Sequence, residues 1–323
     1  MEYENDNYLA KLLTDSSKIE NLNDLLGFLK TLDPDRIKEQ IGSDSTTSLA
    51  FSDKDLYPSY IGYEKHWFNY VSTLRDIILS GETNLSRVVK KMQDALTIKR
   101  PQEIDKAVFL GKLKKVPSEI ITPWRDSLAL TLLTKNCSQD IDCVVEMGSG
   151  PALFLFKFWL TNGPLDADYY ALEITQAGRL CVSIMSCIEP NLKLKPLFFD
   201  YQNPDFSALR NKYKNVLIFS KGSIEQIQTL RDVFFEELLS ISKQLTCVHY
   251  EPVGWQIVKP YKRNSLTRKH KLYCEKRKYN TNLWELLKKF ESRRLININD
   301  YSINFSGKAR HMETYISWTK VPK

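Results

Sequence analysis

Apolar residues in the first hundred positions recur at helical spacing. Leu12 and Leu13 follow Leu9 by three and four residues, so the three leucines fall on one face of a helix. The same spacing predicts short helices between residues 8 and 41 and longer helices over about 64–79 and 84–96. We therefore expect a helical N-terminal subdomain over residues 1–100 that serves as a cap, a lid or a dimerisation surface.

Beyond about residue 124 the pattern changes to short apolar runs that alternate with helical segments. The predicted strands are 143–147, 168–173, 194–199, 215–219, 244–250, 295–304 and 313–319, and the predicted helices are 124–133, 153–160, 175–188, 205–213 and 223–239. Strands that alternate with helices predict an α/β domain with a parallel sheet covered on both faces. Residues 101–123 mix lysines with isolated apolar residues and prolines, and they predict a connector at the start of a second domain over 101–323.

The first predicted strand of this domain ends in Glu146 and runs into Gly148-Ser149-Gly150. Two glycines separated by one residue let the backbone turn sharply and approach a ligand closely. In open α/β sheets, ligands bind outside the carboxyl ends of the strands. A dinucleotide-binding turn requires a further glycine where Leu153 stands, so the dehydrogenase pattern is incomplete. A turn without any ligand remains the other alternative.

Composition and charge narrow the class of protein. No apolar run reaches 18 residues and the N-terminus is acidic, which predicts a soluble cytoplasmic protein. The six cysteines and four histidines are scattered without the spacing of metal ligands, so we expect reduced thiols and no metal site. Residues 1–100 carry 13 Lys/Arg and 16 Asp/Glu, whereas the remainder carries 33 and 23. The excess of Lys/Arg over Asp/Glu beyond residue 100 favours an anionic partner or substrate.

The stretch from Glu146 to Gly150 resembles the first motif of class I S-adenosylmethionine (SAM)-dependent methyltransferases, in which an acidic residue precedes Gly-x-Gly-x-Gly. Ala152 stands at the third glycine. Carboxylates follow the next two predicted strands, as Glu173 and Asp200. The resemblance covers roughly residues 124–323. It implies a Rossmann-like, doubly wound sheet of seven strands, mostly parallel with an antiparallel last strand, and SAM as the cofactor.

The resemblance also implies a role for each acidic strand end. Glu173 would bind the ribose hydroxyls, Asp200 the adenine amino group, and Glu146 with the glycine turn the methionine part. The predicted cofactor-binding residues are Glu146, Gly148, Ser149, Gly150, Glu173, Ile174, Asp200, Tyr201 and Ser220. The alternative is that each carboxylate only caps the helix that follows its strand, which stabilises the helix by roughly 1 kcal/mol.

The acceptor side is expected at the ends of the strands 215–219 and 244–250. His249 is the first choice for a general base, because its ordinary pKa lies near 6.5, and Glu251 would hold the imidazole or act as the base itself. A core position for His249 inside its strand is the alternative. The predicted substrate-binding residues are Ser223, Gln226, Tyr250 and Trp255, although aromatic residues at such positions also serve in packing. The two strand ends loosely resemble those of bacterial sugar and small-molecule O-methyltransferases.

The most basic segment lies between Lys259 and Lys278, where nine Lys/Arg alternate with tyrosines. Such a segment binds phosphates and stacks on bases, or forms a solvated loop. The sequence thus predicts a methyltransferase acting on a hydroxyl or amine of a small polar acceptor, sugar-like or phosphorylated, with a homodimer through the N-terminal helices. The alternatives are an RNA or protein methyltransferase that uses residues 259–278, and a non-catalytic binding or assembly module. Nucleic acid is the less favoured partner, and no membrane association is expected.

Overall fold

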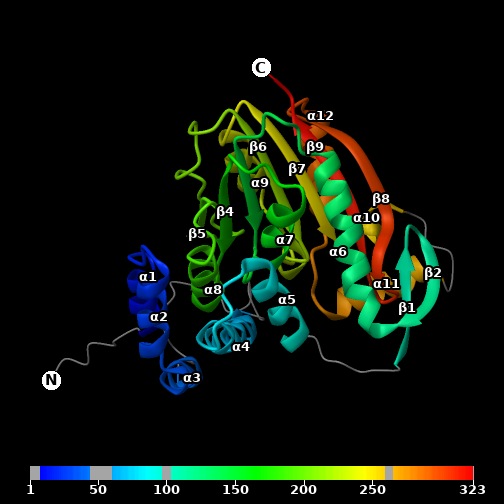
Figure 1. Ribbon diagram of the computed structural model, residues 1–323. Coiled ribbons are helices and arrows are strands. Elements are labelled where there is room, and N and C mark those ends of the chain that lie inside the picture. The colour runs from blue at the N-terminus through cyan, green and yellow to red at the C-terminus, as the bar shows by residue number, and fades with distance from the viewer. Residues whose placement is uncertain (1–7, 44–59, 97–102, 259–264, 323) are drawn as a thin grey trace. The chain divides into compact units, whose positions relative to one another are not determined.

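The computed structural model describes residues 8–43, 60–96, 103–258 and 265–322 (Figure 1). The chain divides into two compact units that are interleaved in sequence. The first unit comprises residues 1–97, 149–161 and 169–198, and the second comprises 98–148, 162–168 and 199–323. The domain division predicted at residue 100 stays a prediction.

The first unit begins with the predicted N-terminal helices. They are α1 (Tyr8–Ser16), α2 (Leu22–Thr31), α3 (Pro34–Ser43), α4 (Tyr60–Leu79) and α5 (Leu85–Leu96). Helix α2 starts at Asn21, whose side chain accepts a hydrogen bond from the backbone N–H of Asp24 and so satisfies one free donor at the helix end. Leu9 and Leu12 are buried, as their helical spacing predicts.

The rest of the first unit contains helices and strands from the α/β part of the chain. Helix α7 (Leu153–Thr161) follows the glycine turn, and strands β4 (Asp168–Glu173) and β5 (Leu194–Phe198) pair in parallel. Helix α8 (Gln176–Ser186) joins these two strands, and Thr175 caps it by accepting a hydrogen bond from Gly178 N–H. Helices α1 and α4 pack on α8, and α5 packs on α7. The N-terminal helices therefore belong to the same compact unit as Ser149 and Gly150 of the glycine turn, whereas Gly148 belongs to the second unit.

The second unit opens with a β-hairpin where the sequence predicts a connector. Strands β1 (Ile104–Phe109) and β2 (Lys112–Pro117) pair in antiparallel register around Leu110 and Gly111, which both have positive φ. Two such residues form the tight turn that suits a two-residue hairpin. Helix α6 (Ser118–Lys135) begins directly after β2. The connector prediction was wrong because single apolar residues between lysines are also the pattern of a half-exposed strand.

Three parallel strands form the centre of the second unit. They are β3 (Cys143–Met147), β6 (Asn215–Lys221) and β7 (Gln244–Glu251). Strands β8 (Ile296–Lys308) and β9 (His311–Lys320) form a long antiparallel pair, and β9 lies antiparallel to β7 (Figure 1). The predicted antiparallel last strand is therefore present.

The order of the strands across the sheet is β2-β1-β8-β9-β7-β6-β3-β4-β5. The prediction of seven strands, mostly parallel, needs correction, because the described residues form a mixed sheet of nine strands. The hairpin β1–β2 supplies the two extra strands, and it joins the sheet by antiparallel pairing of β1 with β8.

The helices of the second unit differ from the prediction in three segments. Residues 205–213 form turns rather than a helix, and the predicted helix 223–239 is divided into a short 3₁₀ turn, η1 (Ile224–Gln226), and α9 (Asp232–Ser240). The described part of the basic segment forms α11 (Leu266–Lys276), between α10 (Gly254–Ile257) and α12 (Leu283–Ser292). Residues 259–264 of that segment lie outside the described residues.

All six cysteines are free, and four of them are buried. Over the described ranges, no group of three or more His, Cys, Asp or Glu side chains is arranged to hold a metal ion. No helix in those ranges has both the length and the apolar character needed to cross a membrane.

Candidate functional site

The turn after β3 adopts the strained backbone that its glycines allow. Gly148 and Gly150 have φ of +63° and +53°, values that cost other residues about 1 kcal/mol or more. At Gly148, a Cβ atom would lie 2.4 Å from Cβ of Ser223 and 3.3 Å from the ring of Tyr201. The Ser223 hydroxyl donates to the backbone oxygen of Met147 over 2.8 Å and lies 2.7 Å from the Tyr201 hydroxyl. Three predicted site residues, Gly148, Tyr201 and Ser223, are thus brought together.

In the first unit, the Glu173 carboxylate binds the backbone of the turn. One oxygen accepts a hydrogen bond from Gly150 N–H at 2.7 Å, and the other accepts from the N–H and hydroxyl of Thr175 at 2.9 and 2.7 Å. Glu173 is only 4% exposed. Burial raises its pKa, and the hydrogen bonds from Thr175 and Gly150 oppose that rise. A carboxylate has about four acceptor positions, so Glu173 retains capacity for one more hydrogen bond.

Helix α4 contributes two residues that the sequence did not single out. The Glu64 carboxylate accepts hydrogen bonds from the backbone N–H groups of Gln176 and Ala177, at 3.0 and 2.6 Å, at the start of α8. The ring of Trp67 lies against Gly150, where an added Cβ would come within 2.8 Å of it. The sequence carries no signal for these contacts, since Glu and Trp are both common in amphipathic helices that bind nothing.

Asp200 closes a turn after β5. Its carboxylate accepts hydrogen bonds from the backbone N–H of Gln202 at 2.7 Å and from the Asn203 side chain at 2.9 Å. The side chain is 3% exposed. The alternative role of a helix cap is therefore excluded for Asp200, because the helix that it would cap is absent.

Glu146 is likewise buried within β3, and Ile174 is half-buried after β4.

His249 occupies a core position rather than an exposed one. Its Nε2 accepts a hydrogen bond from the indole N–H of Trp318 at 3.0 Å, and Nδ1 lies 2.9 Å from the Ser220 hydroxyl. The acceptor role of Nε2 places the proton on Nδ1, which then donates to Ser220. His249 is fully buried, and burial lowers its pKa to about 3. The general-base role predicted for His249 is corrected accordingly, because neither ring nitrogen faces solvent.

Glu251, also fully buried, holds the turn that follows β6. Its carboxylate accepts hydrogen bonds from the backbone N–H groups of Ser223, Ile224 and Glu225 at 3.1–3.2 Å. Burial and the neighbouring charge of Glu225 raise the pKa of Glu251 to about 8, although hydrogen bonds from Ser220 and the backbone act in the opposite direction. The predicted helix over 223–239 is interrupted further on, where Asn280 donates to the backbone oxygen of Ile227 over 2.8 Å and Asn282 accepts from the backbone N–H of Leu230 at 2.9 Å.

Two of the remaining predicted substrate-binding residues, Tyr250 and Trp255, are buried, and the third, Gln226, is half-buried. Tyr250 is fully buried and donates its hydroxyl proton to the backbone oxygen of Ala129 over 2.7 Å. Trp255 is 6% exposed, and the Lys271 ammonium lies 5.9 Å from its ring centroid. Gln226 donates from its side chain to Glu225 over 2.8 Å.

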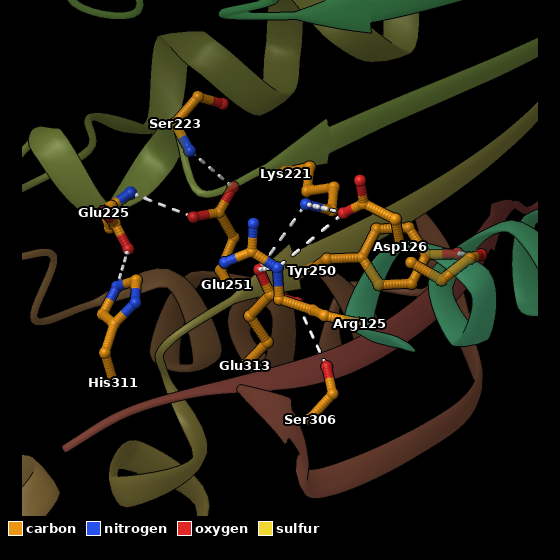
Figure 2. A network of polar contacts seen from close by, with 11 residues as sticks. Arg125, Asp126, Lys221, Ser223, Glu225, Tyr250, Glu251, Ser306, His311 and Glu313 are labelled. Carbon is orange, nitrogen blue, oxygen red and sulfur yellow. Dashed lines mark hydrogen bonds and ion pairs between the residues drawn. The ribbon is translucent and has the colours of Figure 1, made fainter. Parts of the chain in front are cut away.

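A cluster of charged residues lies where β6 and β7 end and β9 begins (Figure 2). Lys221, the last residue of β6, is 3.0 Å from Asp126 and 3.9 Å from Glu313. Arg125 on α6 lies 3.5 Å from the same Glu313 carboxylate. The Ser306 hydroxyl is 3.2 Å from the other oxygen of Glu313. The sequence did not reveal this cluster, because its members are separated by up to 188 positions and share no motif.

The cluster includes a histidine–carboxylate pair. Nε2 of His311 lies 2.6 Å from a carboxylate oxygen of Glu225 (Figure 2). Burial lowers the pKa of His311, but the hydrogen bond to Glu225 and the charges of Glu225 and Glu313 outweigh it, so the pKa is raised. His311 therefore has a carboxylate partner on its imidazole, which is the arrangement that the sequence predicts for His249.

No protein-family model matches this sequence. No curated protein matches it either.

Solved structures similar to this chain include several methyltransferases. A SAM-dependent methyltransferase from Aquifex aeolicus has 12% identity and a TM-score of 0.42, with 63% of this chain and 96% of that chain covered. The plantazolicin methyltransferase BpumL, solved with a monoazolic desmethylPZN analogue and SAH, has 12% identity and a TM-score of 0.42, with 89% of this chain and 100% of that chain covered. Magnesium protoporphyrin IX methyltransferase from Synechocystis, solved with SAH, has 10% identity and a TM-score of 0.40, covering 62% and 84%.

Proposed function

We propose that this protein is a class I SAM-dependent methyltransferase. The observation that carries the proposal is the glycine turn after β3, where both glycines have positive φ and Glu173 accepts the Gly150 N–H. A turn of this kind removes side chains from the place where the backbone approaches a ligand. An acidic residue at the end of the next strand is the partner that the ribose hydroxyls of SAM require.

The chain supplies residues that suit each part of SAM. Glu173 has room for one ribose hydroxyl, and Asp200 is the candidate for the adenine amino group, next to Tyr201. Gly148 and Glu146 are assigned to the methionine part. SAM supplies an activated methyl group when bound, so the protein has to align the acceptor and remove its proton.

The proposed acceptor is a hydroxyl, or an amine, of a small polar molecule. The charged cluster at the ends of β6 and β7 supports this choice, since the Arg125 side chain is 26% exposed. A partly exposed guanidinium binds polar substituents such as phosphate groups. We assign the N-terminal helices a cap function, because Trp67 of α4 lies on Gly150. A homodimer through these helices remains part of the proposal.

Thermal unfolding with added ligands tests the cofactor. A ligand that binds only the folded state raises the melting temperature, and at 100 times its Kd it adds about 2.7 kcal/mol to the unfolding free energy. We expect S-adenosylhomocysteine (SAH) to raise the melting temperature and NAD to leave it unchanged. A shift with NAD alone would establish the dehydrogenase alternative, and no shift with either ligand would favour the non-catalytic module.

A second candidate is methylation of an RNA or protein, and the exposed face of α11 favours it. Arg268, Lys269 and Lys276 are exposed, as are Arg277 and Lys278 after the helix, whereas His270 and Cys274 are buried on the opposite face. A row of cations binds polyanions with an affinity that falls steeply with salt. Salt-dependent binding of a single-stranded RNA oligonucleotide that is lost in Arg268→Ala/Lys269→Ala would support this candidate.

A further inference from the structure

His311 has one ring nitrogen that is engaged and one that is open to a ligand. Among the described residues, only Glu225 hydrogen-bonds the imidazole, and it does so through Nε2 at 2.6 Å. The His311 side chain is 25% exposed, whereas that of Glu225 is 6% exposed. A carboxylate on Nε2 holds the proton there and leaves the Nδ1 lone pair free to accept another proton.

The position of the pair follows from the sheet topology. Because β9 is antiparallel to β7, its first residues lie at the carboxyl end of β7, and Glu251 pairs with Thr314 in the register. The 3₁₀ turn that carries Glu225 is fixed to the same end of β7 by the Glu251 carboxylate. The pair therefore lies at the edge of the sheet where ligands of α/β proteins bind.

Charged and aromatic groups from several elements surround the imidazole. Glu225 on η1, Glu313 on β9 and Arg125 on α6 act on its charge, and His270 on α11 is coupled to it electrostatically. The rings of Tyr273 and Tyr279 lie edge-on at centroid distances of 6.2 and 5.7 Å. These two aromatic rings pack beside the imidazole and help to fix its orientation.

We propose that His311 is the general base of the methyl transfer and that Glu225 is its positioning residue. This inference rests on the proposed function. As the acceptor oxygen forms its bond to the methyl carbon, the carbon–sulfur bond breaks and its electron pair stays on sulfur. The acceptor proton moves to Nδ1 of His311, and Glu225 stabilises the imidazolium that results. The products are the methylated acceptor, SAH and protonated His311, which returns its proton to water.

The rate at which SAH is formed during methyl transfer tests whether His311 is the general base. The assay uses SAM with catechol, D-glucose, UDP-glucose or glycerol phosphate as probe acceptors, between pH 6 and 9. We expect the wild type to turn over at least one probe, with a rate that falls as the pH drops through the pKa of His311. His311→Asn should lower kcat by about 100-fold or more and remove this pH dependence, whereas the exposed Glu236→Gln should match the wild type. Added imidazole should restore part of the rate of His311→Ala.

The outcomes separate this inference from the proposed function. Equal pH profiles for wild type and His311→Asn would overturn the base assignment but leave the methyltransferase intact. Binding of SAH without turnover of any probe would also count against the base and its hydroxyl acceptor. Failure to bind SAH would instead contradict the proposed function itself.

Nuclear magnetic resonance of isotope-labelled histidine measures the pKa and the tautomer of His311 beside Glu225, and it needs no methyl acceptor. We expect the His311 pKa to lie above 6.5, with the neutral ring protonated on Nε2. Glu225→Gln should lower that pKa and should reduce kcat more than it changes KM for SAM. An unchanged His311 titration in Glu225→Gln, or a neutral ring protonated on Nδ1, would overturn the inference.

Discussion

The Glu173 carboxylate accepts a hydrogen bond from the backbone N–H of Gly150 over 2.7 Å, and so connects the end of β4 to the glycine turn. The contact is fully buried, and the same carboxylate also holds Thr175 at the start of α8. Glu173 is therefore a structural residue of the first unit as well as the proposed ribose ligand. This double role shapes the first prediction.

Replacement of Glu173 by alanine should reduce stability even without any ligand. It leaves the buried N–H groups of Gly150 and Thr175 without their acceptor, and an unsatisfied buried donor costs about 1–3 kcal/mol. We expect a lower unfolding free energy in urea for Glu173→Ala, with no comparable loss for the exposed Glu20→Ala. Equal stability of the two variants would show that the carboxylate does not hold the turn.

Replacement of Glu64 should loosen the start of α8. Its carboxylate accepts two backbone N–H groups at that helix end, a contact of the kind that stabilises a helix by about 0.5–2 kcal/mol. Hydrogen exchange of the Gln176 and Ala177 amides should accelerate in Glu64→Ala and stay unchanged in the neighbouring Lys65→Ala. Unchanged protection in Glu64→Ala would contradict this capping role.

His249→Asn should destabilise the protein by about 1–3 kcal/mol, because it removes a fully buried ring with hydrogen bonds to Trp318 and Ser220. The pH inflection of methyl transfer should persist in the variant, in contrast to His311→Asn. Comparison of the two pH profiles on one acceptor provides the measurement. Loss of the inflection in His249→Asn alone would return the base role to that residue.

Glu251 should make stability depend on pH. Its pKa rises from the ordinary 4.5 to about 8 on folding, so the folded state binds this proton more tightly than the unfolded state does. The resulting stabilisation is fully present below pH 4.5 and is lost as the pH rises from 4.5 to 8, with a slope of up to about 1.4 kcal/mol per pH unit. Over that range, wild type should lose stability relative to Glu251→Gln. The exposed Glu236→Gln should follow the wild type at every pH.

Local patterns predicted most of the fold. The helical spacing of the N-terminal leucines and the β-branched run ending at Gly148 both correspond to observed elements. The hairpin at 104–117 was missed because its pairing with β8 depends on residues almost two hundred positions away. The break after Gln226 was also missed, since it depends on hydrogen bonds of Ile227 and Leu230 with Asn280 and Asn282, which lie more than fifty positions away.

The candidate site was predictable only where one motif carried it. The glycine turn and Glu173 could be predicted because each directly follows or ends an apolar strand pattern. The structure joins them by a hydrogen bond from Gly150 N–H to Glu173. By contrast, the sequence does not show whether His249 or His311 is the better candidate for the general base. Both lie in or beside an apolar strand pattern, so the choice depends on which side chain is buried. Only the structure shows that His249 is enclosed and that His311 is partly exposed beside Glu225.

Isothermal titration of the purified protein with SAH measures binding of the proposed cofactor. We expect a Kd in the micromolar range for wild type and Glu20→Ala, and an affinity at least tenfold lower for Glu173→Ala, which corresponds to about 1.4 kcal/mol. Circular dichroism at the titration temperature would verify that Glu173→Ala is folded. Absence of SAH binding by the folded wild type would overturn the proposal that this protein is a SAM-dependent methyltransferase.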